Sequence, residues 1–326
     1  MIITRTPLRI SLGGGGTDLP SYYRTHGGVV ISAAIDKYVY IAINRTFTDD
    51  YFLKYARLER RQSVMEIEHP ILREALTMHD VGPAVEIDSL ADMPSGTGLG
   101  SSGSFTVGLL RALYAFKREH VSASALAEEA CHIEIERLGR SGGKQDQYIA
   151  AFGGVTCFEF CTDDRVHVSP LAISQATLHD LEEHLVLFFT GYSRDADSML
   201  VDQKKKTESG DRAMLDNLAA VADIGRRVKE ALENGDTHRF AALMHEHWEH
   251  KRRRTVGMAT SDIDRWYDAG RAAGALGGKL VGAGAGGFLL FYAEQPQGVR
   301  QAMTGEGLPE VRFQFDFDGS TVIARS

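Results

Sequence analysis

The stretch PSGTGLGSSGSFTVGLL, residues 94–110, constrains the fold of this chain more than any other. Four glycines lie between Gly96 and Gly103, and an apolar run with helical spacing follows them directly. Glycine permits a backbone with positive φ and lets a ligand approach the amide groups closely. The first amide groups of a helix have no partner within it, and the helix dipole is positive there. The sequence therefore predicts a glycine-rich turn into a helix N-terminus that is suited to a phosphate chain.

This loop is not a Walker A loop, because the pattern GxxxxGK[ST] requires a lysine that is absent here. Ser101 and Ser102 add hydroxyl groups, one of which is a candidate ligand for a magnesium ion. A flexible turn capped by serine is the alternative interpretation of the same residues, since glycine-rich turns before helices are common.

Further segments favour the phosphate interpretation. TPLRISLGGGGTDLPSYY (6–23) has Arg9 before its glycines and Asp18 after them, and KLVGAGAGGFLLFY (279–292) is a third glycine-rich segment. The stretch GGKQDQYIAAFGG places Asp146 in a turn of mostly small, uncharged residues, where an acid is not needed for solubility.

The remaining pattern predicts an α+β protein, because strand-like segments and helices occur without regular βαβ alternation. We expect strands over 9–12, 27–35, 37–44, 84–90, 154–160, 165–171, 184–192, 286–293 and 311–324, with Phe313, Phe315 and Phe317 in the core. We expect helices over 101–116, over 122–139 with Ser122 or Ser124 as N-cap and Gly139 at the end, over 212–234, and over 237–254 with Asp236 as N-cap. A length of 326 residues suggests two domains, with a boundary between 165 and 180.

Composition excludes several classes of function. The net charge of −8 argues against a nucleic-acid partner, because phosphate-backbone binding favours a basic surface. No apolar stretch reaches the roughly 18 residues that span a bilayer, and the N-terminus does not have the pattern of a secretory signal. Three cysteines suggest reduced thiols and a cytoplasmic protein.

The glycine-rich segments together resemble the motifs of the GHMP small-molecule kinases. Pro94–Ser102 match P-x-x-x-G-L-G-S-S, Lys279–Gly287 match K-x-x-G-A-G-x-G-G, and Thr17 with Asp18 match the end of the first motif. The resemblance covers nearly the whole chain. It implies an N-terminal domain with a left-handed βαβ-type nucleotide site over 1–170 and a C-terminal ferredoxin-like α/β domain over 171–326, and it implies ATP and Mg²⁺ as cofactors.

The resemblance also implies roles for individual residues. The expected nucleotide-binding residues are Pro94, Ser95, Gly96, Thr97, Gly98, Leu99, Gly100, Ser101, Ser102 and Gly103. Asp146 would accept or orient the proton of the attacking hydroxyl, with Arg9 stabilising charge in the transition state. The expected substrate-binding residues are Gly16, Thr17, Asp18, Lys144 and Gly284. Ser102 and Glu134 are the expected magnesium ligands, with Glu136 as the alternative to Glu134.

Within the family, this chain is most similar to the kinases of D-glycero-D-manno-heptose 7-phosphate. The similarity lies in the first motif and in the stretches IDKYVY, HPILREAL and GGKQDQYIAAFGG. That resemblance implies phosphorylation at O1 to the 1,7-bisphosphate, in the biosynthesis of nucleotide-activated heptose for lipopolysaccharide or capsule. A phosphorylated substrate needs a cationic partner, and the candidates are Lys144, Arg140, Arg194 and the run Lys251–Arg254. Lys204–Lys206 is interpreted as a solvated helix face. The expected partners are a small-molecule sugar phosphate and ATP. We expect neither a nucleic-acid nor a membrane partner, and the question of a homodimer is left open.

Alternatives remain at this point. Fucokinase-type domains carry similar GGxTD and QDQ motifs, which leaves a kinase of a neutral sugar as an alternative. Galactokinases would have Glu-His where Gly15 and Gly16 stand, and the motif GGGGTD also disfavours the diphosphate decarboxylases of the same fold. A non-catalytic galactokinase-like sensor is disfavoured because Asp146 and the loop are intact. A metal site in MHEHWEHK is disfavoured because the spacing is not HExxH.

Overall fold

The computed structural model describes residues 1–191, 196–255, 257–284 and 286–326, and over these it is a mixed α+β protein with two sheets. The larger sheet has the strand order β11-β1-β2-β5-β3-β4, and β6 and β7 continue it from β2. The smaller sheet has the order β8-β10-β9. The strands are β1 (Ile2–Gly13), β2 (Gly28–Arg45), β3 (Tyr51–Lys54), β4 (Leu58–Arg61), β5 (Val85–Ala91), β6 (Val155–Phe160), β7 (Val166–Pro170), β8 (Leu185–Gly191), β9 (Gly277–Val281), β10 (Gly287–Tyr292) and β11 (Thr321–Arg325).

Strand β2 organises the larger sheet. It pairs with β1 on one edge, while its first half pairs with β6 and its second half with β5 on the other edge. The two strands predicted over 27–35 and 37–44 are therefore one. The prediction separated them at Asp36, where the register shifts: Pro7 pairs with Tyr38 but Leu8 pairs with Ile35. A bulge of this kind bends a strand without ending it.

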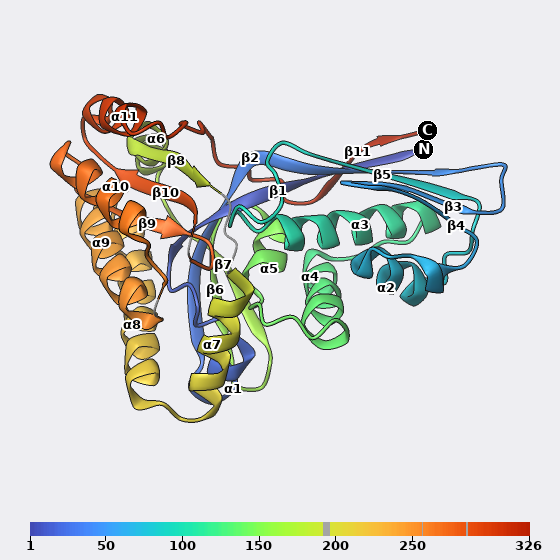
Figure 1. Ribbon diagram of the computed structural model, residues 1–326, viewed down its shortest axis with the longest axis horizontal. Coiled ribbons are helices and arrows are strands. Elements are labelled where there is room, and N and C mark those ends of the chain that lie inside the picture. Colours follow the sequence, from blue (N-terminus) through green and yellow to red (C-terminus); the bar gives the residue numbers. More distant parts are fainter. Residues whose placement is uncertain (192–195, 256, 285) are drawn as a thin grey trace.

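The helices lie along one face of the larger sheet, beside the smaller sheet and, for α8 (Arg212–Glu233), against β1 and β2 (Figure 1). They are α1 (Pro20–His26), α2 (Pro70–Met78), α3 (Ser101–Lys117), α4 (Ala123–Cys131), α5 (Gln145–Phe152), α6 (Gln175–His184), α7 (Ala196–Glu208), α8 (Arg212–Glu233), α9 (Thr237–Arg254), α10 (Ser261–Ala272) and α11 (Pro296–Gly305). Short 3₁₀ and π segments, Val64–Glu66 and His132–Arg137, complete them. Among the described residues, no helix combines the length and apolar character that a membrane span requires.

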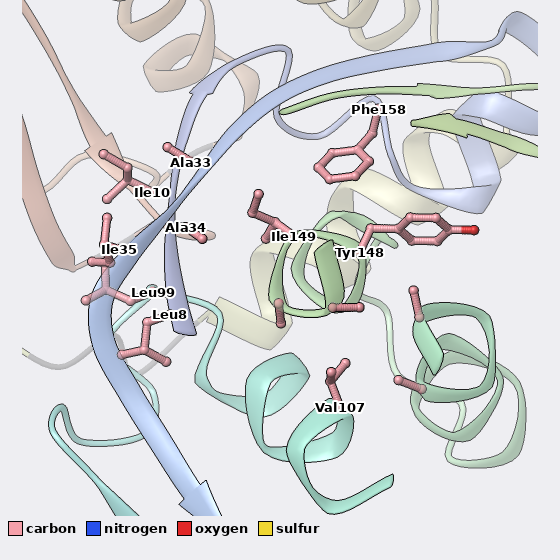
Figure 2. Close-up of a cluster of buried hydrophobic side chains, with 14 of the residues drawn as sticks. Leu8, Ile10, Ala33, Ala34, Ile35, Leu99, Val107, Tyr148, Ile149 and Phe158 are labelled. Carbon is pink, nitrogen blue, oxygen red and sulfur yellow. The ribbon is translucent and has the colours of Figure 1, made fainter. Parts of the chain in front are cut away.

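The core lies between the larger sheet and α3, α4 and α5. Figure 2 shows Leu8 and Ile35 from the strands, Val107 from α3, and Tyr148 with Ile149 from α5 around one apolar interior. Each of these side chains is at most 1% exposed. Because α3 and α5 both pack against this sheet, their N-terminal ends are fixed relative to β1, and these ends form part of the cleft described below.

The smaller sheet confirms the ferredoxin-like expectation. Strands β8, β9 and β10 are antiparallel in the order β8-β10-β9, and a single bridge between Phe188 and Glu310 stands in the place of a fourth strand beside β8. Helix α9 packs against β9, and α8 packs against α9 and against β1 and β2. The chain then returns to the larger sheet, where β11 pairs with β1 and the two termini lie side by side (Figure 1).

The prediction of one strand over 311–324 was wrong. Only Thr321–Arg325 forms a strand, and Phe317 is 58% exposed, whereas Phe313 and Phe315 are buried as expected. The carboxylate of Asp316 accepts hydrogen bonds from the backbone N–H groups of Asp318 and Gly319. This side chain–backbone turn breaks the alternation and directs Phe317 outward.

Other local predictions were confirmed. Ser122, not Ser124, caps the helix that begins at Ala123, and Gly139 follows its end with a φ of 65°. Asp236 caps α9, and its carboxylate accepts a hydrogen bond from the N–H of Arg239. The π segment at the end of α4 was not expected, and it carries one of the candidate metal ligands.

Candidate active site

A cleft of about 280 Å³ lies where the two sheets and their helices meet. Its walls come from β1 and the turn after it, the glycine-rich loop before α3, the π segment, the start of α5, α7, α9, and β9 with the turn after it. The residues that line it are Arg9, Ser11, Gly15, Gly16, Asp18, Leu19, Gly96, Gly98, Gly100–Gly103, Glu134, Ile135, Arg140–Gly143, Gln145–Gln147, Leu200, Gln203, His247, Lys251, Arg254 and Lys279–Ala283. Segments far apart in the sequence thus share one cavity.

The glycine-rich loop lies directly against the third glycine-rich segment. Gly98 has a φ of 85°, and a Cβ built on it would lie 3.0 Å from the Cα of Gly282. Such a backbone conformation is costly for other residues, and the contact leaves no room for a side chain. Helix α3 begins immediately after the loop, so its first amide groups face the cleft from Ser101 onward. The two segments therefore form one continuous wall of glycine backbone.

Arg9 and Asp146 form an ion pair at this wall. Nε of Arg9 donates to Oδ1 of Asp146 over 2.7 Å, and Nη1 donates to the carbonyl oxygen of Gly98 over 2.6 Å. Arg9 is 5% exposed, whereas 29% of the Asp146 side chain remains exposed. A Cβ on Gly103 would lie 2.8 Å from the Cβ of Asp146, so α3 and α5 approach closely here. The pair is thereby held beside the first turn of α3.

Asp18 is a buried carboxylate near Asp146. It accepts hydrogen bonds from the backbone N–H groups of Gly16 and Gln145, over 3.0 and 3.2 Å. Burial, followed by the negative charge of Asp146, raises the pKa of Asp18 above its ordinary value. Its bond to Gln145 fixes the start of α5 and hence the position of Asp146.

Glu134 is bound to Ser102 and lies on the π segment. Its carboxylate accepts hydrogen bonds from the Ser102 hydroxyl, from Oγ1 of Thr106 over 3.0 Å and from Nε2 of Gln147 over 2.9 Å, and Arg140 forms an ion pair with it over 2.7 Å. It is 3% exposed. π segments are rare and occur often at functional sites.

The geometry separates Glu134 from the alternative, Glu136. The side chain of Glu136 is 58% exposed and pairs with His132 on the outer surface. Ser102 and Glu134 supply oxygen donors of the kind that Mg²⁺ prefers, and Mg²⁺ usually takes its remaining ligands from water and substrate phosphates. The described residues hold no group of three or more His, Cys, Asp or Glu side chains arranged for a metal.

A buried cationic cluster faces these acids. It consists of Lys251 and Arg254 on α9 and Lys279 on β9, all at most 8% exposed, with the buried His247 beside them. Nζ of Lys279 lies 3.1 Å from Nδ1 of His247. Burial and the nearby charge of Arg9 lower the pKa of Lys279 to about 7, and burial lowers the pKa of Arg254 to about 10.

Sequence reasoning found only part of this cluster. The run Lys251–Arg254 was a candidate, but Lys279 was recognised only as the first residue of a motif, and His247 only as part of MHEHWEHK, where a metal site was disfavoured. The signal available was the lysine at the start of the third segment. Its distance from α9 along the chain concealed the contact, which forms because α9 packs against β9.

Some expected residues lie outside the cleft. Lys144 is buried behind it, paired with Glu128 over 3.0 Å, and it lines a separate cavity with Tyr23. Thr17 and Gly284 do not line the cleft, and neither do Pro94, Ser95, Thr97 and Leu99 of the expected nucleotide-binding set. The hydroxyl of Thr17 binds the carbonyl oxygens of Gly14 and Val29, which shapes the turn. Arg194 lies outside the described residues.

A glycine-backbone wall at a helix N-terminus, an arginine–aspartate pair and a cluster of buried cations define a phosphotransferase site. The profile of the GHMP kinases N-terminal domain matches residues 62–154, and that of the GHMP kinases C-terminal domain matches residues 228–308. A D-glycero-alpha-D-manno-heptose 7-phosphate kinase from Campylobacter jejuni is 32% identical over 305 residues, which is 90% of this chain and 89% of the relative.

Two further relatives are similar over most of this chain. The crystal structure of a D-glycero-D-manno-heptose 1-phosphate kinase from Bacteroides thetaiotaomicron has a TM-score of 0.82 and 27% identity, with 100% of both chains covered. An L-fucokinase/L-fucose-1-P guanylyltransferase from Bacteroides fragilis is 26% identical over 95% of this chain, which spans 37% of that longer protein. The chain belongs to the GHMP kinase family. It is a sugar kinase that transfers phosphate to a hydroxyl group.

Proposed function

We propose that this protein uses ATP to phosphorylate D-glycero-D-manno-heptose 7-phosphate at O1, giving the 1,7-bisphosphate. The observation that carries this choice within the sugar kinases is the presence of Arg254 and Lys279 as buried cations in the cleft, because buried cations are costly unless an anion neutralises them. A sugar that already carries a phosphate supplies that anion. The similarity to heptose phosphate kinases supports the same substrate class.

The roles of the site residues follow from their positions. The amide groups from Gly98 to Gly103 would hold the triphosphate at the start of α3. Asp146 would accept the proton of the attacking hydroxyl, because its carboxylate is the one beside the loop that remains partly exposed in the cleft. Arg9 would stabilise the charge that develops during transfer. Asp18 would orient the sugar and keep Asp146 in place.

We further propose Mg²⁺ as the metal, held by Ser102 and Glu134. The ion, when bound, neutralises charge on the transferred phosphate. In the protein alone, Arg140 contacts both ligands and would have to move aside or bind the nucleotide itself.

Glu134→Gln is expected to raise the Mg²⁺ concentration required for half-maximal activity by roughly 10-fold or more, since the change removes a charged oxygen ligand. ADP release measured across a Mg²⁺ titration checks this. Glu136→Gln is the matched control, because it makes the same change two residues along on the outer surface. Equal shifts in the two variants would contradict the assignment of Glu134.

The substrate proposal predicts a clear preference for the phosphorylated sugar. We expect kcat/KM for heptose 7-phosphate to exceed that for the unphosphorylated heptose by roughly 10²-fold or more, since two charge-assisted contacts of about 1.5–3 kcal/mol each would be gained. Coupled ADP release over heptose 7-phosphate, free heptose, mannose 6-phosphate and fucose checks the preference. Phosphorus NMR of the product checks O1 as the site of transfer. Preference for fucose or another neutral sugar would favour the fucokinase-like alternative.

A further inference from the structure

Arg254, the last residue of α9, is buried in the cleft beside the turn that follows β1. Its Nε donates to the side-chain oxygen of Asn217 over 3.1 Å, and its Nη1 lies 3.3 Å from Oε1 of Gln203. A Cβ on Gly16 would lie 2.4 Å from Nη1, so the guanidinium touches the turn that follows β1. These contacts hold the guanidinium plane in one orientation.

One nitrogen of this guanidinium has no partner. Nη2 of Arg254 is buried and makes no hydrogen bond in the described part of the chain, and the same holds for Nε2 of His247. Both residues line the cleft. An unpaired buried donor costs roughly 1–3 kcal/mol, and more when it is charged. Two such atoms in one cavity indicate that the cavity is shaped for a ligand with several acceptor oxygens.

Arg254 lies near Asp18, the residue that the proposed function assigns to the sugar. Among the charged groups, Asp18 is the one whose charge raises the pKa of Arg254, against the effect of burial. Asp18 in turn feels the charge of Asp146. Asp18 is thus close to both Arg254 and Asp146. The proposed function places the attacking hydroxyl at Asp146, and Arg254 carries the guanidinium nitrogen that has no partner among the described residues.

Lys251 differs from Arg254 in this respect. Its Nζ donates to the carbonyl oxygens of Leu280, over 2.8 Å, and Gly282. Gly282 touches Gly98 of the nucleotide loop. The ammonium group of Lys251 therefore supports the wall of glycine backbone, whereas Arg254 keeps a free donor.

We propose that Arg254, through Nη2, binds the phosphate that the substrate already carries, and that Lys279 and His247 complete this subsite. The assignment rests on the proposed function. Arginine suits this task because its planar guanidinium presents fixed donors to phosphate oxygens, and its charge persists where a buried lysine loses its proton. Arg254 thereby selects phosphorylated over free sugars.

The test compares variants on two substrates, heptose 7-phosphate and free heptose. Arg254→Gln is expected to lower kcat/KM for heptose 7-phosphate by roughly 10- to 100-fold, and to change kcat/KM for free heptose by no more than about threefold. Arg254→Lys should recover part of the loss. Arg253→Gln is the matched control, because Arg253 is 73% exposed and pairs with Glu249 outside the cleft. It should leave both substrates unaffected.

Binding measured by calorimetry keeps the test independent of turnover. Heptose 7-phosphate should bind Arg254→Gln at least about 10-fold more weakly than the unmodified protein, while ATP affinity stays the same and shows that the variant is folded. An equal loss on both substrates, or a loss of ATP affinity alone, would overturn the role of Arg254. Absence of ADP release by the unmodified protein with any sugar phosphate would instead contradict the proposed function.

Discussion

Asp146→Asn is expected to lower kcat by roughly 10²- to 10⁴-fold, the range typical of a lost general base. Asparagine has nearly the same shape and can still accept the hydrogen bond from Nε of Arg9, which now spans 2.7 Å. It cannot accept a proton from the attacking hydroxyl. ATP affinity should therefore change little, and the loss should appear in kcat when ADP release is followed at saturating substrate.

Asp164→Asn is the matched control for this change. Asp164 also pairs with an arginine Nε, that of Arg24, over 2.8 Å, but it lies outside the cleft. Removing its charge should leave kcat within about twofold of the unmodified protein, since exposed ion pairs contribute little. Turnover of Asp146→Asn near that of the unmodified protein would contradict its role as base and leave a purely electrostatic mechanism.

Gly98→Val is expected to weaken ATP binding by roughly 10²-fold or more, since a displaced loop would lose at least two charge-assisted contacts to phosphate. Valine is strongly disfavoured at a φ of 85°, and its Cβ would lie 3.0 Å from both the Cα of Gly282 and the carbonyl oxygen of Val281. The loop must move, and the carbonyl oxygen that binds Arg9 moves with it. Calorimetry with ATP measures the effect.

Gly210→Val separates loss of the loop from general backbone strain. Gly210 has a φ of 72°, a Cβ added to it would meet nothing within 4 Å, and it lies in the turn between α7 and α8, outside the cleft. This variant should lose stability in thermal unfolding while it keeps its ATP affinity. Unchanged ATP affinity in a folded Gly98→Val protein would show that the loop is only a turn.

Much of the fold could be predicted because local patterns determine it. Helices α3, α8 and α9 have apolar residues at helical spacing, and α8 and α9 begin at aspartate caps. Strands β8 and β10 of the smaller sheet follow from apolar runs, whereas β9 was not predicted. The prediction failed where a local irregularity changed the course of the backbone. Asp316 ends the alternating run of phenylalanines, and the bulge at Asp36 bends β2 without ending it, so that two predicted strands are one.

The glycine-rich segments by themselves identified the family, because close backbone contacts admit no other residue type and so leave a recognisable pattern. They also marked Arg9, Asp18, Ser102 and Asp146, which the structure brings to one cleft. The cationic side chains that could bind a substrate phosphate left no such pattern in the sequence. Lys144 has the right charge but is neutralised by Glu128 behind the cleft, whereas Lys279 and Arg254 face it. Which cation faces the cleft is decided by the packing of α9 against β9, and it depends on contacts between residues far apart in the sequence.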